Sequence, residues 1–255
     1  MNPILEQILF MQKIGGLRKL LLMRKKHSLG LQLVRGYAAT TCFWTLANAG
    51  FFDELLVKEE IDLKDFARGT ELNLEVLRAM CEYLDGIKIL NCEGDRCFLD
   101  RKGKMLLEEP RGLFELLYGY EPVFRELESL ATSKKHYGTD IHRRGEAVAK
   151  GSGALGKQFP FLAVRQLVHD HGFRHVLDLG CGDLEFLFLL CEQPQVTAIG
   201  IDNDPDALAY ACSRLRDSKN GRLSVASGDM FHVQELAEKF PDVDAITAID
   251  VFHEY

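Results

Sequence analysis

The stretch Val176-Leu-Asp-Leu-Gly-Cys-Gly-Asp183 decides the fold class of this 255-residue chain. An apolar run surrounds Asp178, two glycines follow at Gly180 and Gly182, and apolar residues with helical spacing come next. This order is typical of a buried parallel strand, a tight turn and a helix, which together form a nucleotide-binding crevice. Glycine is favoured in the turn because it adopts positive φ and has no Cβ to keep a ligand away. The pattern alone also fits NAD enzymes and ordinary turns.

Three further β-rich runs of the sequence end in polar residues. The second run ends in Asp202, about 20 residues after the glycine turn, where a carboxylate can accept both ribose hydroxyls. The third reaches Asp229, and the fourth reaches Asp250 and His253. In an open α/β sheet the carboxyl ends of parallel strands meet at one edge, so we expect these side chains around one ligand. The three runs cover residues 196–202, 223–231 and 244–253.

A helix is expected directly after the second of the four strands. Asp204 is a plausible N-cap, and Pro205 suits the first helical position because it needs no backbone donor there. Asn203 lies between the ribose-binding candidate and this cap. We therefore count Asn203 among the expected ligand contacts.

The residues after the second glycine distinguish a dinucleotide from S-adenosylmethionine. A diphosphate site requires a third glycine, whereas Gly182 is followed by Asp183, Leu184 and Glu185. The two carboxylates are expected to repel a diphosphate but not a ligand that carries a sulfonium and an ammonium group. Simple capping of the helix explains these two acids equally well.

The third strand supplies a second criterion. Asp229 is placed to accept a hydrogen bond from the adenine amino group, while the neighbouring Met230 packs against the ring. A charge-assisted hydrogen bond of this kind contributes on the order of 1.5–3 kcal/mol. Together, these residues favour S-adenosylmethionine as the cofactor.

The segment from about residue 137 to residue 255 resembles class I S-adenosylmethionine-dependent methyltransferases, and the whole chain is similar to the two-domain small-molecule O-methyltransferases. The acidic D-x-G-x-G motif of that family is matched by Asp178, Gly180 and Gly182. Its ribose-binding acid is matched by Asp202. The resemblance implies an α/β fold with a Rossmann-like methyltransferase sheet, preceded by a mainly α winged-helix domain.

The resemblance extends to the third and fourth strands. The family's G-D-M-F is present as Gly228-Asp229-Met230-Phe231, and its H-D-W appears as His253-Glu254-Tyr255. The histidine of that motif is the general base, so the resemblance implies O-methylation of a small-molecule acceptor with His253 as catalytic residue; C- or N-methylation are alternatives. The chain departs from the family at Leu184, where a small residue is usual, at Ile249, where a basic residue is frequent, and at Tyr255, where Trp is usual.

The N-terminal half is predicted to be mostly helical, with a β-hairpin around Glu93-Gly94-Asp95. Asn73 is expected to cap a helix over residues 74–84. Helices followed by a hairpin form a winged-helix unit, which the resemblance assigns to homodimerisation and to one wall of the acceptor pocket. DNA binding is disfavoured, because Glu75, Arg78 and Glu82 give the candidate recognition helix a net negative face.

The expected domain limits are 1–135 for the helical dimerisation and pocket domain, 136–159 for a linker that covers the cofactor, and 160–255 for the cofactor domain. Small polar residues before 136 and the glycine-rich Lys150–Gly153 suggest the boundary. Within the linker, Tyr137 and Arg144 are candidate contacts to the cofactor's carboxylate. Pro122 is expected to kink or split the preceding helix.

Composition and charge narrow the possible partners. The net charge of −7 disfavours a nucleic-acid surface, and no apolar run is long enough to span a membrane. The first 30 residues are basic, which fits a membrane surface, a presequence, a solvated helix face or, as we favour, a dimerisation arm. The seven cysteines form no C-x-x-C pair and indicate free thiols in a reducing cytoplasm. No His or Cys spacing indicates a metal site.

The chain ends at Tyr255, directly after the fourth expected strand. A methyltransferase sheet normally has seven strands, so we expect a C-terminally truncated sheet with an apolar edge. The alternative to an active enzyme is therefore a non-catalytic cofactor-binding and dimerising scaffold, or an inactive fragment.

Overall fold

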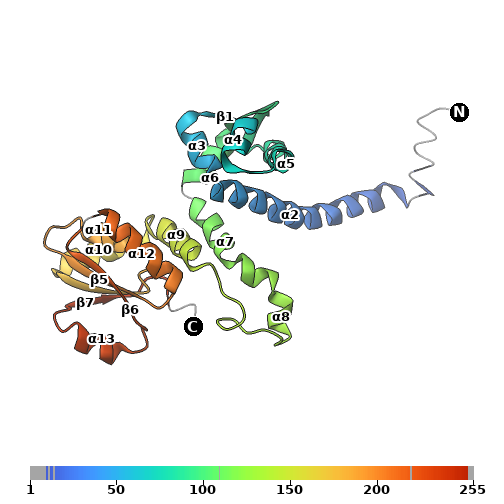
Figure 1. Cartoon of the computed structure of the whole chain (residues 1–255). Helices are drawn as coiled ribbons and strands as arrows, with labels where there is room; N and C mark the ends of the chain where they lie inside the picture. The colour runs from blue at the N-terminus through green and yellow to red at the C-terminus, as the bar shows by residue number, and fades with distance from the viewer. Residues whose placement is uncertain (1–9, 11, 14, 109, 219, 252–255) are drawn as a thin grey trace. The chain divides into compact units, whose positions relative to one another are not determined.

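The computed structural model describes residues 10, 12–13, 15–108, 110–218 and 220–251 (Figure 1). The described chain forms two compact units that divide after Asp100. The sequence analysis placed limits at residues 135 and 159, which separate parts of the chain with different expected functions. These limits stay predictions.

The first unit is a helical layer with a small antiparallel sheet, and its core is aromatic. Phe43 stacks on Phe52 with ring centroids 4.5 Å apart, and Phe51 meets Phe66 edge-on at 5.1 Å. The sheet has the order β1-β3-β2. The elements are α2 (Gly16–Asn48), α3 (Phe51–Lys58), β1 (Glu60–Asp62), α4 (Leu63–Thr70), α5 (Leu74–Gly86), β2 (Leu90–Glu93) and β3 (Arg96–Leu99).

Local sequence signals explain several limits in this unit. The Asn73 side chain accepts hydrogen bonds from the backbone of Glu75 and Val76, which confirms it as the cap of α5. The predicted hairpin is confirmed as β2 and β3, with Gly94 at a φ of 66° in the turn. Across this hairpin Cys92 and Cys97 form a disulfide, so the prediction of free thiols is wrong for these two, which pairing in register brings together.

The second unit is built on a parallel four-stranded sheet with the order β6-β5-β4-β7. Figure 1 shows α10, α11 and α12 on one face of this sheet and α13 on the other. The elements are α6 (Arg101–Glu108), α7 (Arg111–Arg125), α8 (Leu127–Ala131), α9 (Gly145–Gly156), α10 (Pro160–His171), β4 (His175–Leu179), α11 (Glu185–Leu190), β5 (Thr197–Asp202), α12 (Pro205–Ser218), β6 (Leu223–Ser227), α13 (Val233–Lys239) and β7 (Ala245–Thr247).

Alternation along the central strand divides the core of this unit in two. Val176 faces the cluster formed with α10, α11 and α12, whereas Leu177 and Leu179 face the cluster that includes Leu236 of α13. Burial on both faces explains the continuous apolar runs in the sequence. The strand order places a topological switch at β4, because the chain crosses to β5 on one side and later to β7 on the other.

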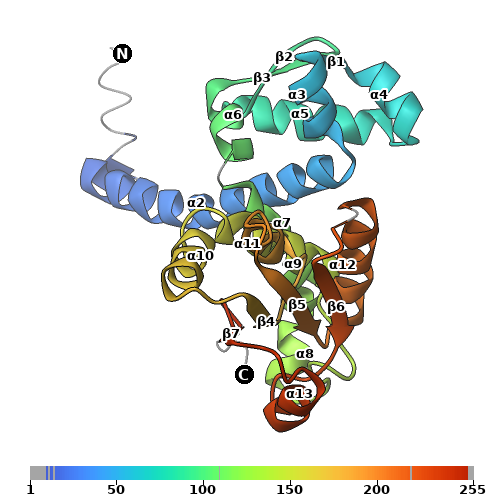
Figure 2. The same cartoon turned by 90° about the vertical axis from the view of Figure 1, so that its left-hand side faces the viewer.

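The glycine-rich segment that suggested a linker lies instead within α9. Glycine is required there because α7 and α9 pack with their backbones in close contact. A Cβ on Gly112 would lie 2.7 Å from the backbone oxygen of Gly151, and a Cβ on Gly151 would lie 2.8 Å from that of Gly112. Figure 2 shows the two helices beside each other in this unit. The helix α7 contains Pro122 and continues to Arg125, so Pro122 does not split it, and a kink there stays a prediction.

No described helix is both long enough and apolar enough to cross a membrane.

Candidate cofactor site

The glycine turn after β4 has the conformation that the sequence predicts. Gly180 has a φ of 73° and Gly182 a φ of 51°, both in the left-handed region. The backbone nitrogen of Gly180 donates to the carbonyl oxygen of Ile201 at 2.7 Å, which ties the turn to β5. A Cβ on Gly180 would lie 2.6 Å from the Val251 side chain, so the turn has no room for a larger residue.

Leu184 occupies the position where the resemblance implies a small residue, and its backbone is left-handed with a φ of 66°. For a leucine this conformation costs roughly 1–2 kcal/mol. The side chain is fully buried in the core cluster of α10, α11 and α12, which offsets the strain. It packs over Gly200 of β5, where a Cβ would lie 3.0 Å from a Leu184 methyl group and 2.7 Å from the Cys181 sulfur.

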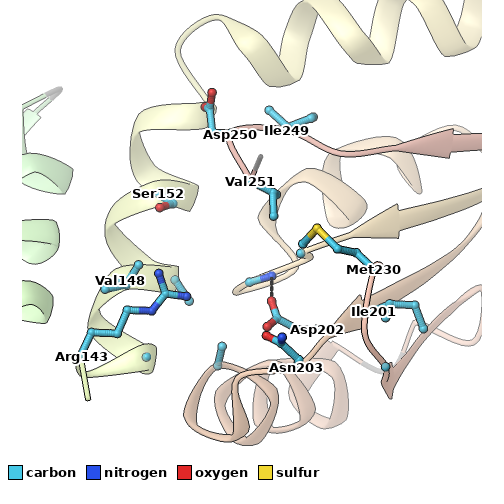
Figure 3. A pocket seen from close by; sticks show the side chains of 16 residues that line it. Arg143, Val148, Ser152, Ile201, Asp202, Asn203, Met230, Ile249, Asp250 and Val251 are labelled. Atoms are coloured by element: carbon cyan, nitrogen blue, oxygen red, sulfur yellow. Dashed lines mark hydrogen bonds between the residues drawn. The ribbon is translucent and has the colours of Figure 1, made fainter. Parts of the chain in front are cut away.

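Asp202 ends β5 and connects the two strand tips. Its Oδ2 accepts a hydrogen bond from the backbone nitrogen of Gly182 at 3.0 Å, drawn as a dashed line in Figure 3, and its Oδ1 accepts from the backbone nitrogen of Asp204 at 2.9 Å. Asp204 in turn caps α12 through the backbone nitrogens of Asp206 and Ala207, as predicted. The carboxylate of Asp202 is thus fixed at the mouth of the turn.

Asp178 is buried below the turn and does not line the pocket. The hydroxyl of Thr247 on β7 donates to its Oδ1 at 2.7 Å. Burial raises the pKa of Asp178 to about 7; the hydrogen bond from Thr247 opposes this rise, and the nearby Asp202 adds to it. Asp178 therefore joins two neighbouring strands instead of facing the ligand space.

A pocket opens at the carboxyl edge of the sheet and encloses about 630 Å³, including its open mouth (Figure 3). Its walls come from α9 and the segment before it, from the glycine turn, and from the ends of β5, β6 and β7. This is the edge at which open α/β sheets bind ligands. The lining residues are Arg143, Gly145, Val148, Ala149, Ser152, Gly180, Gly182, Ile201, Asp202, Asn203, Ala207, Gly228, Met230, Ile249, Asp250 and Val251.

Six of the predicted cofactor residues come together in this pocket, and four do not. Those that line it are Gly180, Gly182, Asp202, Asn203, Met230 and Asp250; those that do not are Asp178, Asp229, Tyr137 and Arg144. The predicted catalytic residue, His253, lies outside the described residues. Asp250, in the pocket wall, also has a left-handed backbone, with a φ of 55°.

Asp229 stands beside the pocket rather than in its wall. Its Oδ1 accepts a hydrogen bond from the backbone nitrogen of Phe231, and its Oδ2 lies 4.0 Å from Nδ1 of His232. The neighbouring Met230 is buried and lines the pocket. The strand tip therefore offers a sulfur atom and an apolar surface where an aromatic ring was predicted to pack.

Arg143, which the sequence did not single out, lines the pocket, whereas Arg144 points to α7. Arg144 donates to the carbonyl oxygen of Tyr118 at 2.6 Å and to Glu121 at 2.9 Å. Arg143 donates to the Tyr120 hydroxyl at 2.9 Å, and its Nε lies 3.5 Å from Asp204. Neighbouring residues in a loop face different ways, and the sequence carried no signal for which one faces the pocket.

Tyr137 lies in an adjoining groove with Tyr120, His142 and Arg143. The contacts from α9 were also missed, namely Val148, Ala149 and Ser152, although their small side chains are what the close approach of a helix requires.

Asp183 and Glu185 do not repel anions as the sequence suggested, because two cations neutralise them. Arg214 of α12 donates to both carboxylates at 2.7 Å, and Lys157 lies 2.8 Å from Glu185. The charge argument against a diphosphate is thus wrong at this position. Asp183 also accepts from the backbone nitrogen of Glu185, which supports the capping alternative.

Among the described residues, no group of three or more His, Cys, Asp or Glu side chains could hold a metal ion.

Residues 171–255 match a family model described as a methyltransferase domain. No significant match is found among curated protein sequences. Two solved structures are similar over most of the chain. Mitomycin 7-O-methyltransferase MmcR is 13% identical, with a TM-score of 0.60, over 92% of this chain and 73% of that one. An O-methyltransferase family protein from Burkholderia thailandensis is 17% identical, with a TM-score of 0.56, over 85% and 68%.

A third structure, PigF with SAH, is 16% identical, with a TM-score of 0.55, over 79% of this chain and 66% of that one. The chain spans about two thirds of the length of the structures it matches. The backbone of the pocket fits S-adenosylmethionine, since its left-handed glycines leave the turn open and Asp202 faces the cavity. Residues 171–255 thus match a methyltransferase domain, and the chain shares its fold with these solved methyltransferases.

Proposed function

We propose that this protein transfers the methyl group of S-adenosylmethionine to a small-molecule acceptor. The observation that carries the proposal is the convergence of the glycine turn, the Asp202 carboxylate and Met230 on one pocket. When bound, the cofactor supplies an electrophilic methyl carbon on a sulfonium. The task of the protein is then to hold the two reactants in line, which can contribute roughly 7–11 kcal/mol to lowering the barrier.

Each wall of the pocket has a proposed part in holding the cofactor. Asp202 would accept the ribose hydroxyls, because its carboxylate is fixed at the mouth of the turn by two backbone donors. Met230 would pack against adenine, with Asn203 and Asp229 near its polar edge. Arg143 lines the pocket and is our candidate to bind the carboxylate of the cofactor; Tyr137 and Arg144, which do not line it, stay predictions. Gly180, Gly182 and Asp250 would contact the methionine end.

O-methylation with His253 as general base is the proposed reaction. Asp250 and Val251 line the pocket, and His253 follows two residues later in the chain. A hydroxyl acceptor must lose a proton during transfer, and a histidine with a pKa near neutrality accelerates such a step by about 10²–10⁴-fold. C- and N-methylation are the alternatives for the same pocket.

Isothermal titration calorimetry with S-adenosylmethionine and S-adenosylhomocysteine tests the cofactor site. We expect the wild type to bind both, and Asp202→Asn to weaken binding at least about tenfold, because it removes a charge-assisted acceptor. Asp217→Asn is the matched control, since Asp217 is an exposed acid near the end of α12. Absence of binding by the wild type, or equal affinities for the two variants, contradicts the proposal.

A methyl-transfer assay on a panel of phenols, amines and carbon acids tests the reaction. His253→Ala should keep cofactor affinity and lose most turnover of hydroxyl acceptors. Unchanged turnover would exclude His253 as the base. Cofactor binding without transfer to any acceptor would favour the scaffold alternative.

The first unit is proposed to be a winged-helix dimerisation domain. The helix α2 exposes large apolar side chains along its length, among them Leu33, Val34 and Tyr37, which a second copy would cover. DNA binding is not proposed, because the cation of the candidate recognition helix, Arg78, is bonded to Glu75 and Asp95. Light scattering after gel filtration should give a dimer, and Val34→Glu should give a monomer.

A cytoplasmic location is proposed because five of the seven cysteines are free, as is common in a reducing compartment. Alkylation of these thiols in intact cells tests it, and their complete oxidation would contradict it.

A further inference from the structure

Arg214 lies on α12, outside the pocket wall, yet its guanidinium contacts the segment that forms the turn. One nitrogen, Nη1, donates to both the backbone carbonyl oxygen and the Oδ2 of Asp183, each at 2.7 Å. The other, Nη2, donates to Glu185 at 2.7 Å. The ring of Phe188 lies below the guanidinium, 5.0 Å from its carbon. A single side chain thus holds three points of residues 183–188.

Residues 183–188 are the part of the site whose conformation must be stabilised by contacts from elsewhere in the unit. This segment follows directly on Gly182, whose backbone nitrogen donates to Asp202 in the pocket. It includes Leu184, which is strained by its positive φ. A strained backbone persists only where the surrounding contacts determine it. The bonds of Arg214 to Asp183, on one side of Leu184, and to Glu185, on the other, supply that constraint.

The same contacts reach the helix that covers the pocket. Gly153 of α9 lies directly against the Asp183 carboxylate, and any side chain at position 153 would displace it. Lys157, just after α9, is bonded to Glu185. The pocket side of α9 carries Ser152, which Figure 3 shows across from the turn. The turn and the covering helix therefore meet at the carboxylates that Arg214 binds.

We infer that Arg214 is a positioning residue of the cofactor site, which fixes the glycine turn and the facing part of α9 through Asp183 and Glu185. Arg214 itself does not line the pocket. Arg214 has this role only if the pocket binds S-adenosylmethionine as proposed above.

The charges around Asp183 give this role a measurable signature. Burial raises the pKa of Asp183 to about 6, and Arg214 and Lys157 oppose that rise, while Glu185 adds to it. The other titratable groups facing this cluster are Cys181 of the turn and Tyr210 of α12. Without Arg214 the pKa of Asp183 rises further, toward neutrality. A buried carboxyl with a raised pKa opposes its buried position less once it is protonated, so a lower pH favours the arrangement of the turn that buries Asp183.

The experiment measures the affinity of the full chain for S-adenosylhomocysteine from pH 6 to pH 8. We expect Arg214→Met to weaken binding about tenfold at pH 8 and to regain part of the affinity at pH 6. Arg214→Lys keeps the charge but not the forked geometry. Its affinity for S-adenosylhomocysteine should lie between that of the wild type and that of Arg214→Met. Arg216→Met, an exposed residue two positions on in the same helix, is the control and should match the wild type.

A double variant separates positioning from a general loss of structure. Asp183→Asn removes the titrating group, so the pH dependence gained in Arg214→Met should disappear in the double variant. Wild-type affinity and pH profile in a folded Arg214→Met protein would overturn the inference. If that variant does not fold, Arg214→Lys decides: wild-type affinity would overturn the inference, and reduced affinity at an unchanged melting temperature would support it.

Amide hydrogen exchange distinguishes a failure of the proposed function from a failure of the contacts assigned to Arg214. If the wild type does not bind S-adenosylhomocysteine, the proposed function fails, but exchange in residues 180–188 can still be compared. Faster exchange in Arg214→Met than in Arg216→Met supports the positioning of the turn, and equal exchange overturns it.

Discussion

The two compact units differ in what fills their interiors. The first packs large aromatic side chains, with Phe43, Phe51 and Phe52 fully buried. The second brings backbones into contact through glycines, as at Gly112 and Gly151, and leaves a pocket at the sheet edge. Large side chains contribute more to stability, whereas bare backbone admits a ligand. We therefore expect core substitutions in the first unit to change stability and turn substitutions in the second to change binding.

The two units also differ in the pKa values of individual buried or paired carboxyl groups. In the first unit, hydrogen bonds from Arg78 and Lys64 lower the pKa of Asp95 far below its usual value. In the second, burial raises the pKa values of Asp178 and Asp183 to about 7 and about 6. Paired carboxylates stabilise a fold when ionised, and buried ones oppose it. Asp178 and Asp183 are thus held at a cost to stability, as is common at functional sites.

The largest expected effect is on the aromatic core. Phe52→Ala should lower the free energy of unfolding of the first unit by about 3–5 kcal/mol, because it leaves a cavity among the stacked rings. Urea denaturation followed by tryptophan fluorescence measures it, since Trp44 lies in the same unit. The affinity of this variant for S-adenosylhomocysteine should stay unchanged. A loss of affinity as large as the loss of stability would contradict the division of roles between the two units.

The counterpart in the second unit is Gly180→Ala. The added methyl group must accept a left-handed backbone and a contact of 2.6 Å with Val251, a strain of about 1–3 kcal/mol. We expect cofactor affinity to fall about a hundredfold by calorimetry, with a smaller change in melting temperature. Gly221→Ala, where nothing lies within 4 Å of the new methyl group, is the control and should bind normally. Equal behaviour of both variants would contradict the assigned role of the turn.

A smaller effect is expected from pH. The raised pKa of Asp178 means that its contribution favours the folded state at low pH and is lost as the pH rises through about 7. Between pH 6 and pH 8 the second unit should lose about 1.4 kcal/mol of stability. Thermal unfolding of the wild type and of Asp178→Asn measures this loss. The variant should have a flatter profile, and an unchanged slope would exclude Asp178 as its source.

The smallest effects compare two helix caps. Asn73→Ala and Asp204→Ala each remove a side chain that accepts two backbone hydrogen bonds, and each should cost about 1 kcal/mol. Only the second removes a partner of the pocket residue Arg143. Calorimetry should therefore show weaker cofactor binding for Asp204→Ala alone. Weaker cofactor binding by both variants would contradict the expectation that helix caps of the first unit affect stability alone.

The sequence was most informative where backbone chemistry dictates residue type. Gly180 and Gly182, the caps Asn73 and Asp204, and the fourfold recurrence of strands are short-range signals, and the structure bears them out. The direction of a side chain depends on tertiary packing, which a single sequence does not reveal. Arg143 and Arg144 are chemically identical neighbours that both donate hydrogen bonds to α7, yet only Arg143 lines the pocket.

The helical state of the glycine-rich segment in α9 could not be predicted for the same reason. Glycine ordinarily weakens a helix by about 1 kcal/mol relative to alanine, so the segment resembled a linker. Its helical state depends on α7 and on Asp183, which lie far away in the sequence. Leu184 was recognised as unusual, but its compensation by Gly200 could be seen only once β5 was in place.

The bond between Asp178 and Thr247 also bears on how the chain is made. Its two residues are 69 positions apart, and β7 is the last strand to be synthesised among the four. During translation β4, β5 and β6 can pair as they emerge. The other side of β4 stays unpaired until β7 has been synthesised. Contacts between distant residues form slowly. The ligand space is therefore completed late, and until then nascent chains expose a sheet edge to which a chaperone could bind.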